Sequence, residues 1–204
     1  NFLDVWKASG SRDSFAIWLA KIENGERVPG WKELQEKDFI TEIGPLSKLS
    51  PVTYLDKDQR KDYEMQVKKG NIYTKHSGSK PLHTTVKANK NNRDYIFVIS
   101  PENKVYIGIY EKGVMQHSSF LSGGAVQSAG LLVMKNGKIA EITNKSGHYQ
   151  PTPQMISNAL MVFKAQGIKI DGIIVNLLPA KEGDNWQTIT ASELLTRYRP
   201  TIVI

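Results

Sequence analysis

The chain of 204 residues contains no cysteine, which excludes disulfide bonds, thiolate metal sites and a cysteine nucleophile. No apolar run approaches the roughly 18–20 residues that a membrane-spanning helix needs, so we expect no membrane span. No basic region followed by an apolar one opens the sequence, so no secretory signal peptide is visible. The Walker loop, the dinucleotide-type Gly-x-Gly-x-x-Gly, the Gly-x-Ser-x-Gly elbow and His-Glu-x-x-His are also missing. With only four histidines and no cysteine, we expect no metal site.

Acidic residues are fewer than basic ones: the chain has 20 aspartates and glutamates and 27 lysines and arginines, which gives a net charge of +7. Such an excess attracts acidic partners. The densest basic cluster, at 57–69, is nevertheless interrupted or flanked by Asp56, Asp58, Asp62 and Glu64. This mixture favours a solvated surface. Because no nucleic-acid-binding motif accompanies it, we do not expect a nucleic-acid partner.

Hydrophobic residues make up 40% of the chain and charged residues 23%, which is typical of a globular protein with a core. The length is near the upper end of the usual single-domain range of roughly 100–200 residues. We therefore predict one domain over 1–204. It divides into a helical or irregular amino-terminal part, 1–53, and a β-rich core, 54–204.

Turn signals divide the second part into antiparallel hairpins, at 68–71, 100–103 and 135–138. The last contains Asn-Gly, the strongest short hairpin signal. Apolar spacing predicts a helix over about 154–166, and apolar runs predict buried strands at 173–175 and 201–204. Because strands do not alternate with helices, the predicted class is α+β: hairpins form a curved sheet or split sheets with a packed helix.

Two short histidine segments are the candidates for a working surface. In the first, His117 is followed by Ser118, Ser119 and Phe120, and then by a glycine-rich bend where a ligand can approach closely. We expect this segment on a strand. The alternative is therefore that the histidine is a structural hydrogen-bonding group and that the serines are edge or rim residues of that strand.

The second segment is Ser146-Gly147-His148-Tyr149, just before the predicted helix. Backbone N–H groups at such a position suit an anion such as a diphosphate. A structural role is the alternative here too. The catalytic hypothesis requires His117 and His148 to converge on one pocket.

These segments carry a family resemblance, together with Tyr95–Val98, Ala129-Gly130 and Asn136-Gly137. The chain resembles the core domain of the plant IQ-motif calmodulin-binding protein family, most strongly over about 94–166. Similar segments occur in fungal proteins and in the carboxy-terminal toxin domains of bacterial effectors. The plant proteins bind calmodulin through an IQ helix outside this core. No Ile-Gln-x-x-x-Arg pattern is present here, so the resemblance does not carry calmodulin binding over.

Through the bacterial relatives, the resemblance implies a divergent mono-ADP-ribosyltransferase that transfers ADP-ribose from NAD to a target protein, such as a host regulatory protein like ubiquitin. Such an effector or toxin is secreted or injected and acts in the target-cell cytosol. On this interpretation His117, His148 and Glu64 are catalytic, with Glu141 as the alternative carboxylate. The residues assigned to NAD binding are Arg60, Arg93, Ser118, Ser119, Phe120, Ser146, Gly147 and Tyr149.

Two other functions stay open. The first is a non-catalytic protein-interaction module, in which the same residues stabilise the hairpins. The second is a hydrolase that uses His148 as a base and does not use NAD.

Overall fold

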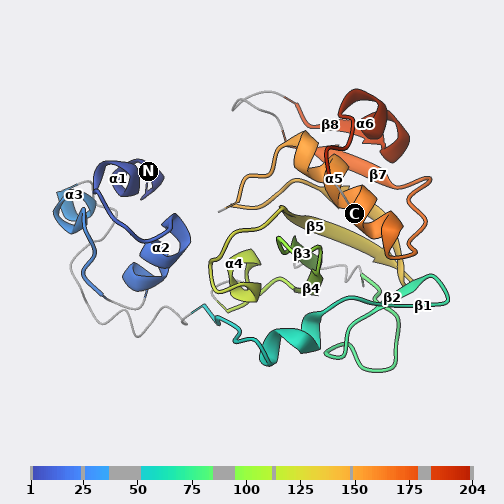
Figure 1. Cartoon of the computed structure of the whole chain (residues 1–204), viewed down its shortest axis with the longest axis horizontal. Coiled ribbons are helices and arrows are strands. Elements are labelled where there is room, and N and C mark those ends of the chain that lie inside the picture. The colour runs from blue at the N-terminus through green and yellow to red at the C-terminus, as the bar shows by residue number, and fades with distance from the viewer. Residues whose placement is uncertain are drawn as a thin grey trace.

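The computed structural model describes residues 2–23, 26–36, 52–84, 95–111, 114–147, 149–178 and 185–202. Within these ranges the chain is α+β, as predicted, with helices beside open sheets and no closed barrel (Figure 1). None of the described helices is long and apolar enough to cross a bilayer.

The amino-terminal part is helical, with α1 (Phe2–Ala8), α2 (Phe15–Glu23) and α3 (Trp31–Glu36). The three helices share a small core that includes Val5, Trp18 and Leu34, each fully buried. The indole Nε1 of Trp18 donates a hydrogen bond of 2.8 Å to the carbonyl of Pro29, which fixes the turn before α3. The boundary at residue 53 and the single domain over 1–204 stay predictions.

A six-stranded sheet forms the centre of the remaining chain, in the order β4-β3-β5-β6-β7-β8. Its strands are β3 (Tyr95–Ile99), β4 (Val105–Ile109), β5 (Ser128–Lys135), β6 (Lys138–Thr143), β7 (Ile174–Leu177) and β8 (Gln187–Thr190). All neighbours are antiparallel except β6 and β7, whose connection contains the helix α5 (Pro153–Ala165). A separate hairpin joins β1 (Gln66–Lys68) to β2 (Asn71–Tyr73). The short 3₁₀ helix η2 (Gln59–Tyr63) precedes this hairpin.

Two of the predicted turns are confirmed as tight two-residue hairpins. Asn136 and Gly137 both have positive φ, 50° and 82°, as does the pair Lys69 and Gly70 at 52° and 69°. Positive φ at both central residues gives the turn a twist that matches its strands. A Cβ on Gly137 would also lie 2.7 Å from that of Asn71, so this turn needs glycine for packing as well.

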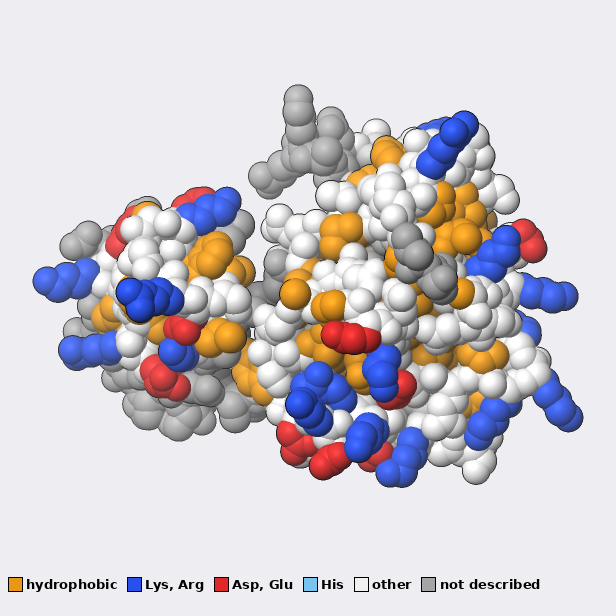
Figure 2. All heavy atoms as spheres, viewed as in Figure 1, with side chains coloured by type: hydrophobic (Ala, Val, Ile, Leu, Met, Phe, Trp, Pro, Cys, Tyr) orange, Lys and Arg blue, Asp and Glu red, His pale blue; other side chains and the backbone are white. Residues whose placement is uncertain are grey.

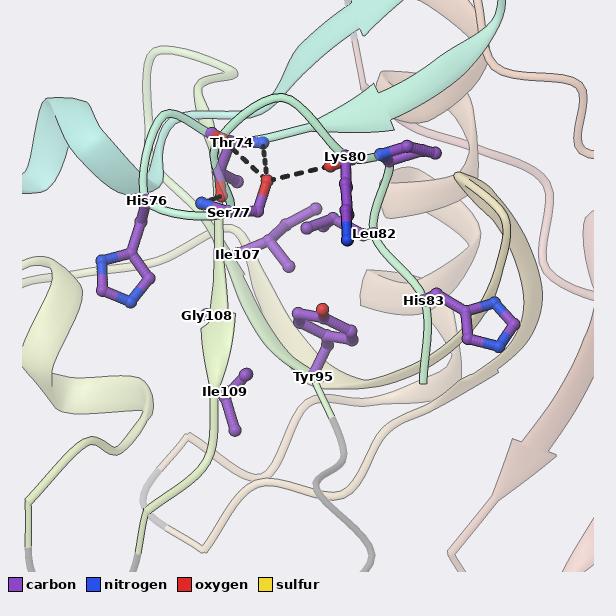
Figure 3. A pocket seen from close by; sticks show the side chains of 11 residues that line it. Thr74, His76, Ser77, Lys80, Leu82, His83, Tyr95, Ile107, Gly108 and Ile109 are labelled. Carbon is purple, nitrogen blue, oxygen red and sulfur yellow. Dashed lines mark hydrogen bonds between the residues drawn. The ribbon is translucent and has the colours of Figure 1, made fainter. Parts of the chain in front are cut away.

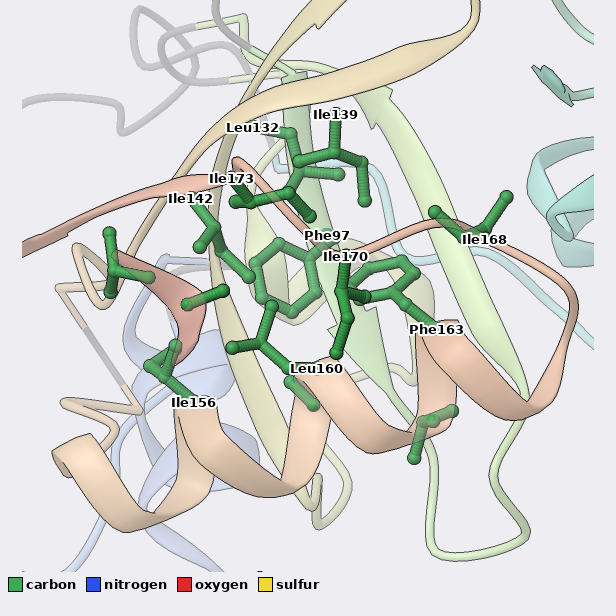
Figure 4. Packing of buried hydrophobic residues seen from close by; sticks show 14 of the residues in the cluster. Phe97, Leu132, Ile139, Ile142, Ile156, Leu160, Phe163, Ile168, Ile170 and Ile173 are labelled. Carbon is green, nitrogen blue, oxygen red and sulfur yellow. The ribbon is translucent and has the colours of Figure 1, made fainter. Parts of the chain in front are cut away.

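The main core lies between α5 and one face of the sheet (Figure 4). The predicted stripe of Ile156, Leu160 and Phe163 is fully buried, and Phe163 meets Phe97 of β3 edge to face at 5.7 Å. Thr152 caps the helix by accepting a hydrogen bond from the backbone N–H of Met155. Amphipathic spacing and a cap therefore place α5 where the sequence predicts it.

Two local expectations are wrong, and two elements were not predicted from the sequence. Residues 117–120 form a short helix, α4 (His117–Phe120), where we expected a strand. β8 and the helix α6 (Ala191–Arg197) are additional elements. The predicted final strand is absent from its described part, because the backbone N–H of Thr201 donates to Asn158 Oδ1 of α5 at 2.9 Å instead of pairing with a strand. Val203 and Ile204 lie outside the described residues.

Candidate functional site

The first histidine segment lies inside the protein. α4 begins with a capping box, in which the backbone N–H of Gln116 donates to Ser119 Oγ at 2.9 Å. Exposure of the four residues that follow Gln116 is 7% or less, and it is zero for Ser119 and Phe120. The sequence identified this segment as unusual, but the structure shows its residues packed in the interior.

His117 joins α4 to the sheet. Its Nε2 lies 2.9 Å from the carbonyl oxygen of Gly130 on β5. A carbonyl only accepts hydrogen bonds, so Nε2 carries the hydrogen and donates it. A general base needs an accessible lone pair within reach of substrate, and this nitrogen is committed to the backbone. The geometry is that of a structural hydrogen bond.

Phe120 stacks within the protein. Its ring meets Tyr106 of β4 at 6.3 Å in a stacked arrangement and Tyr63 at 5.8 Å edge to face. The three rings form part of a second core, on the sheet face opposite α5, together with Ile96 and Val98. Phe120 therefore fills the interior, a position from which stacking on a nicotinamide ring requires displacement of these neighbours.

The bend after α4 is held from two sides. Ser122 Oγ donates to the carbonyl of Leu55 at 3.0 Å, and the backbone N–H of Leu55 donates to the carbonyl of Ser119 at 2.9 Å. From the other side, the hydroxyl of Tyr149 donates to the carbonyl of Gly124 at 3.0 Å. Burial raises the pKa of Tyr149 to about 12, so the phenol stays protonated and keeps this bond at neutral pH.

Only part of the second histidine segment is described. Ser146 is buried, and its Oγ has no hydrogen-bond partner among the described residues, whereas Gly147 is exposed. His148 and Arg93 lie outside the described residues. The convergence of His117 and His148 on one pocket, and NAD binding, stay predictions of the sequence.

Of the remaining predicted residues, Glu64 and Arg60 lie near Tyr106 of the edge strand β4, whereas Glu141 is on β6. Glu64 pairs with Lys104 at 3.2 Å beside the edge strand β4. Arg60 donates from Nε to the carbonyl of Asp56 at 3.3 Å. Glu141 accepts a hydrogen bond from Asn176 at 3.0 Å on β6. Three strand spacings, roughly 14 Å, separate β6 from β4, so the two candidate carboxylates do not share a site.

On the face shown in Figure 2, lysine and arginine side chains are spread out and mixed with acidic side chains. Lys61 pairs with Asp58 and Lys75 with Asp62, each at 2.7 Å. The hydrogen bond and charge of Lys61 hold the pKa of the Asp58 carboxyl below its ordinary value. Both pairs fit the solvated surface that the sequence indicates. Across the described ranges, no cluster of three or more histidine and acidic side chains could hold a metal ion.

Comparison with known proteins gives matches to plant IQ-motif proteins. Residues 59–156 match the family model described as the IQ motif-containing protein middle domain. IQ domain-containing protein IQM2 of Arabidopsis thaliana is 33% identical over 174 residues, which cover 84% of this chain and 27% of that protein. IQ domain-containing protein IQM1 of the same plant is 32% identical over 176 residues, covering 84% of this chain and 32% of that protein. No solved structure matches the chain.

The chain thus spans about a third or less of the length of these relatives. They are named as IQ domain-containing plant proteins, and not as toxins or transferases. The prediction of an NAD-dependent ADP-ribosyltransferase, and of a secreted or injected bacterial effector, is therefore wrong. The resemblance to the plant IQ-motif proteins is confirmed over most of the chain. The matches give no support for extending this resemblance to bacterial transferases.

Proposed function

We propose that this domain is a non-catalytic protein-interaction module related to the core of the plant IQ-motif calmodulin-binding family. The observation that carries the proposal is the buried hydrogen bond from His117 Nε2 to the carbonyl of Gly130. This bond gives His117 a structural role and not a catalytic one. The match of residues 59–156 to the IQ motif-containing protein middle domain supports the same function.

The partner we infer is an acidic regulatory protein. The net charge of +7 favours such a partner through long-range attraction, which also speeds association. Calmodulin, an acidic protein, is the first partner to test. Because the chain contains no Ile-Gln-x-x-x-Arg pattern, binding would use the folded surface and not an IQ helix.

The test is the variant His117→Ala, with the exposed His76→Ala as control. Removing the imidazole leaves the buried Gly130 carbonyl without this donor, at a cost of about 1–3 kcal/mol. Each 1 kcal/mol corresponds to roughly 2–4 °C of Tm in a chain of this size. We expect the Tm to fall by several degrees, more than for His76→Ala, with calmodulin affinity by calorimetry unchanged at a temperature where the variant is folded.

The same preparations are incubated with labelled NAD and a protein extract. The non-catalytic proposal predicts no labelled protein with either variant or with the original chain. Transfer of label that disappears in His117→Ala while its Tm is unchanged would overturn it. If titrations with and without calcium detect no complex with calmodulin, calmodulin is excluded as the partner.

A further inference from the structure

A pocket of about 340 Å³ has none of the residues assigned to catalysis in its lining (Figure 3). Its apolar lining comes from Leu82 and from Ile107 and Ile109 of the edge strand β4. The segment 74–83 borders it, and Tyr95 of β3 stands on its other side. No motif in the sequence indicates this pocket, because its lining comes from three separate stretches of the chain.

The bordering segment is held in shape by its own hydrogen bonds. Thr74 and Ser77 bond reciprocally, since each backbone N–H donates to the hydroxyl of the other at 3.1 Å. At the far end, the backbone N–H of Leu82 donates to the carbonyl of Ile72 at 2.9 Å, and its carbonyl accepts from Gly137 at 2.7 Å. A wall fixed at both ends does not have to be ordered when a ligand binds, which favours affinity.

Two polar groups point toward one another across the pocket, the ammonium of Lys80 and the hydroxyl of Tyr95 (Figure 3). Lys80 has no carboxylate partner in the described part of the chain, in contrast to Lys75, which pairs with Asp62 at 2.7 Å. Burial raises the pKa of the Tyr95 phenol, so the hydroxyl keeps its hydrogen and can donate it to a ligand.

The rings of the two histidines in the lining make contacts at its edge. His83 Nδ1 accepts the backbone N–H of Asn136 at 3.0 Å, and the ring is turned away from the pocket. The ring of His76 stacks on Tyr63 at a centroid distance of 4.5 Å, at the rim. Among the described lining residues, Lys80 is the only lysine or arginine.

We propose that this pocket binds a small monocarboxylate with an apolar or aromatic body. The single ammonium matches one negative charge, and the hydroxyl of Tyr95 donates to the second carboxylate oxygen. The aliphatic side chains of Leu82, Ile107 and Ile109 receive the apolar body. The volume is near the lower end of the roughly 300–1,000 Å³ of ligand pockets, which limits the ligand to a small molecule. The site is independent of the proposed partner binding.

The probe is 3-phenylpropionate, with the uncharged 3-phenylpropanol as its matched control. Both are titrated into the whole, isotope-labelled chain and followed by amide NMR. We expect the acid to shift the amide signals of residues 74–83 and 107–109, and to bind at least about tenfold more tightly than the alcohol, as a charge-assisted hydrogen bond implies.

Lys80→Met keeps an unbranched apolar side chain and removes the charge. It should weaken binding of the acid about tenfold or more and leave the alcohol unaffected, while Lys75→Met on the same segment should leave both unaffected. Tyr95→Phe should also weaken the acid selectively. Amide spectra that match the original chain outside the pocket show that each variant is folded. Equal binding of acid and alcohol, unchanged affinity in Lys80→Met, or no shifts at millimolar probe would each overturn the proposal.

Discussion

At the scale of single residues, Gly130 is where the first histidine segment and the strand pairing meet. Its carbonyl accepts the hydrogen bond of His117, and its backbone lies between Phe97 on β3 and Thr143 on β6. A Cβ built there would lie 1.9 Å from the carbonyl oxygen of Thr143 and 3.0 Å from the Phe97 ring. The close approach of three strands and α4 thus depends on the missing side chain.

Gly130→Ala is therefore expected to destabilise the domain strongly, by about 3 kcal/mol or more, because backbone atoms must move to admit the methyl group. Gly147→Ala is the control, since a Cβ there meets no atom within 4 Å and the backbone is not left-handed. Urea denaturation followed by far-UV circular dichroism measures both. Equal stability of the two variants would show that the β5–β6 pairing adjusts without cost.

At the scale of secondary-structure elements, the sequence predicts those elements whose turns, caps or apolar stripes are specified by neighbouring residues. The hairpin turn at Asn136-Gly137 needs two left-handed residues, and α5 has a stripe, a cap and a terminating Gly167, so neighbouring residues specify each. α4 has only four residues, which are too few to show a repeating apolar pattern in the sequence. Its burial depends on strands that are distant in the chain. β8 alternates weakly, because three of its four residues are exposed.

The helix α6 has a signal that could have identified it, a capping box. Thr190 Oγ1 accepts the N–H of Glu193 at 3.2 Å, and the Glu193 carboxylate accepts the backbone N–H of Thr190 at 2.8 Å. These bonds from Thr190 hold the pKa of Glu193 below its ordinary 4.5. Since the pKa is lower in the folded state, this stabilisation is present above about pH 4.5 and is lost as the pH falls through the lowered pKa.

Thr190→Ala should lower the free energy of unfolding by about 1 kcal/mol at neutral pH, the typical value of an amino-terminal cap. The difference from the original chain should shrink in acid, because the Thr190 hydroxyl donates to the Glu193 carboxylate at 2.9 Å and this bond weakens when Glu193 is protonated. Ser192→Ala, an exposed position in the same helix, is the control. Urea denaturation at several pH values between neutral and acid checks this, and a difference that grows in acid would contradict the assignment.

For the whole molecule, residues from distant segments decide the function, and this limits what the sequence can predict. The segment around His117 is recognisable, but its burial depends on β3, β4 and β5 together. The pocket between Lys80 and Tyr95 could not be predicted from the sequence, because its lining comes from three separate stretches of the chain. Family resemblance, by contrast, depends on the order of residues along the chain, so it was available from the sequence.

The described cores divide the chain near the predicted boundary at residue 53. The cluster of α1, α2 and α3 draws only on residues 5–34, whereas the two clusters of the sheet draw only on residues from Leu55 onward. Because neither group of clusters contributes buried residues to the other, we expect the truncated chain 52–204 to fold. Its Tm should stay within a few degrees of that of the full chain.

The control for this truncation is removal of 191–204, which takes Ala191 and the fully buried Leu194 from the main core. Loss of the Leu194 side chain alone is expected to cost roughly 2–5 kcal/mol, so this second truncation should unfold the sheet or lower its Tm far more. Calorimetry and amide NMR compare the two. If the chain 52–204 is unfolded while the full chain is stable, the helices of residues 1–36 fold cooperatively with the sheet. That result would support the prediction of one domain over 1–204.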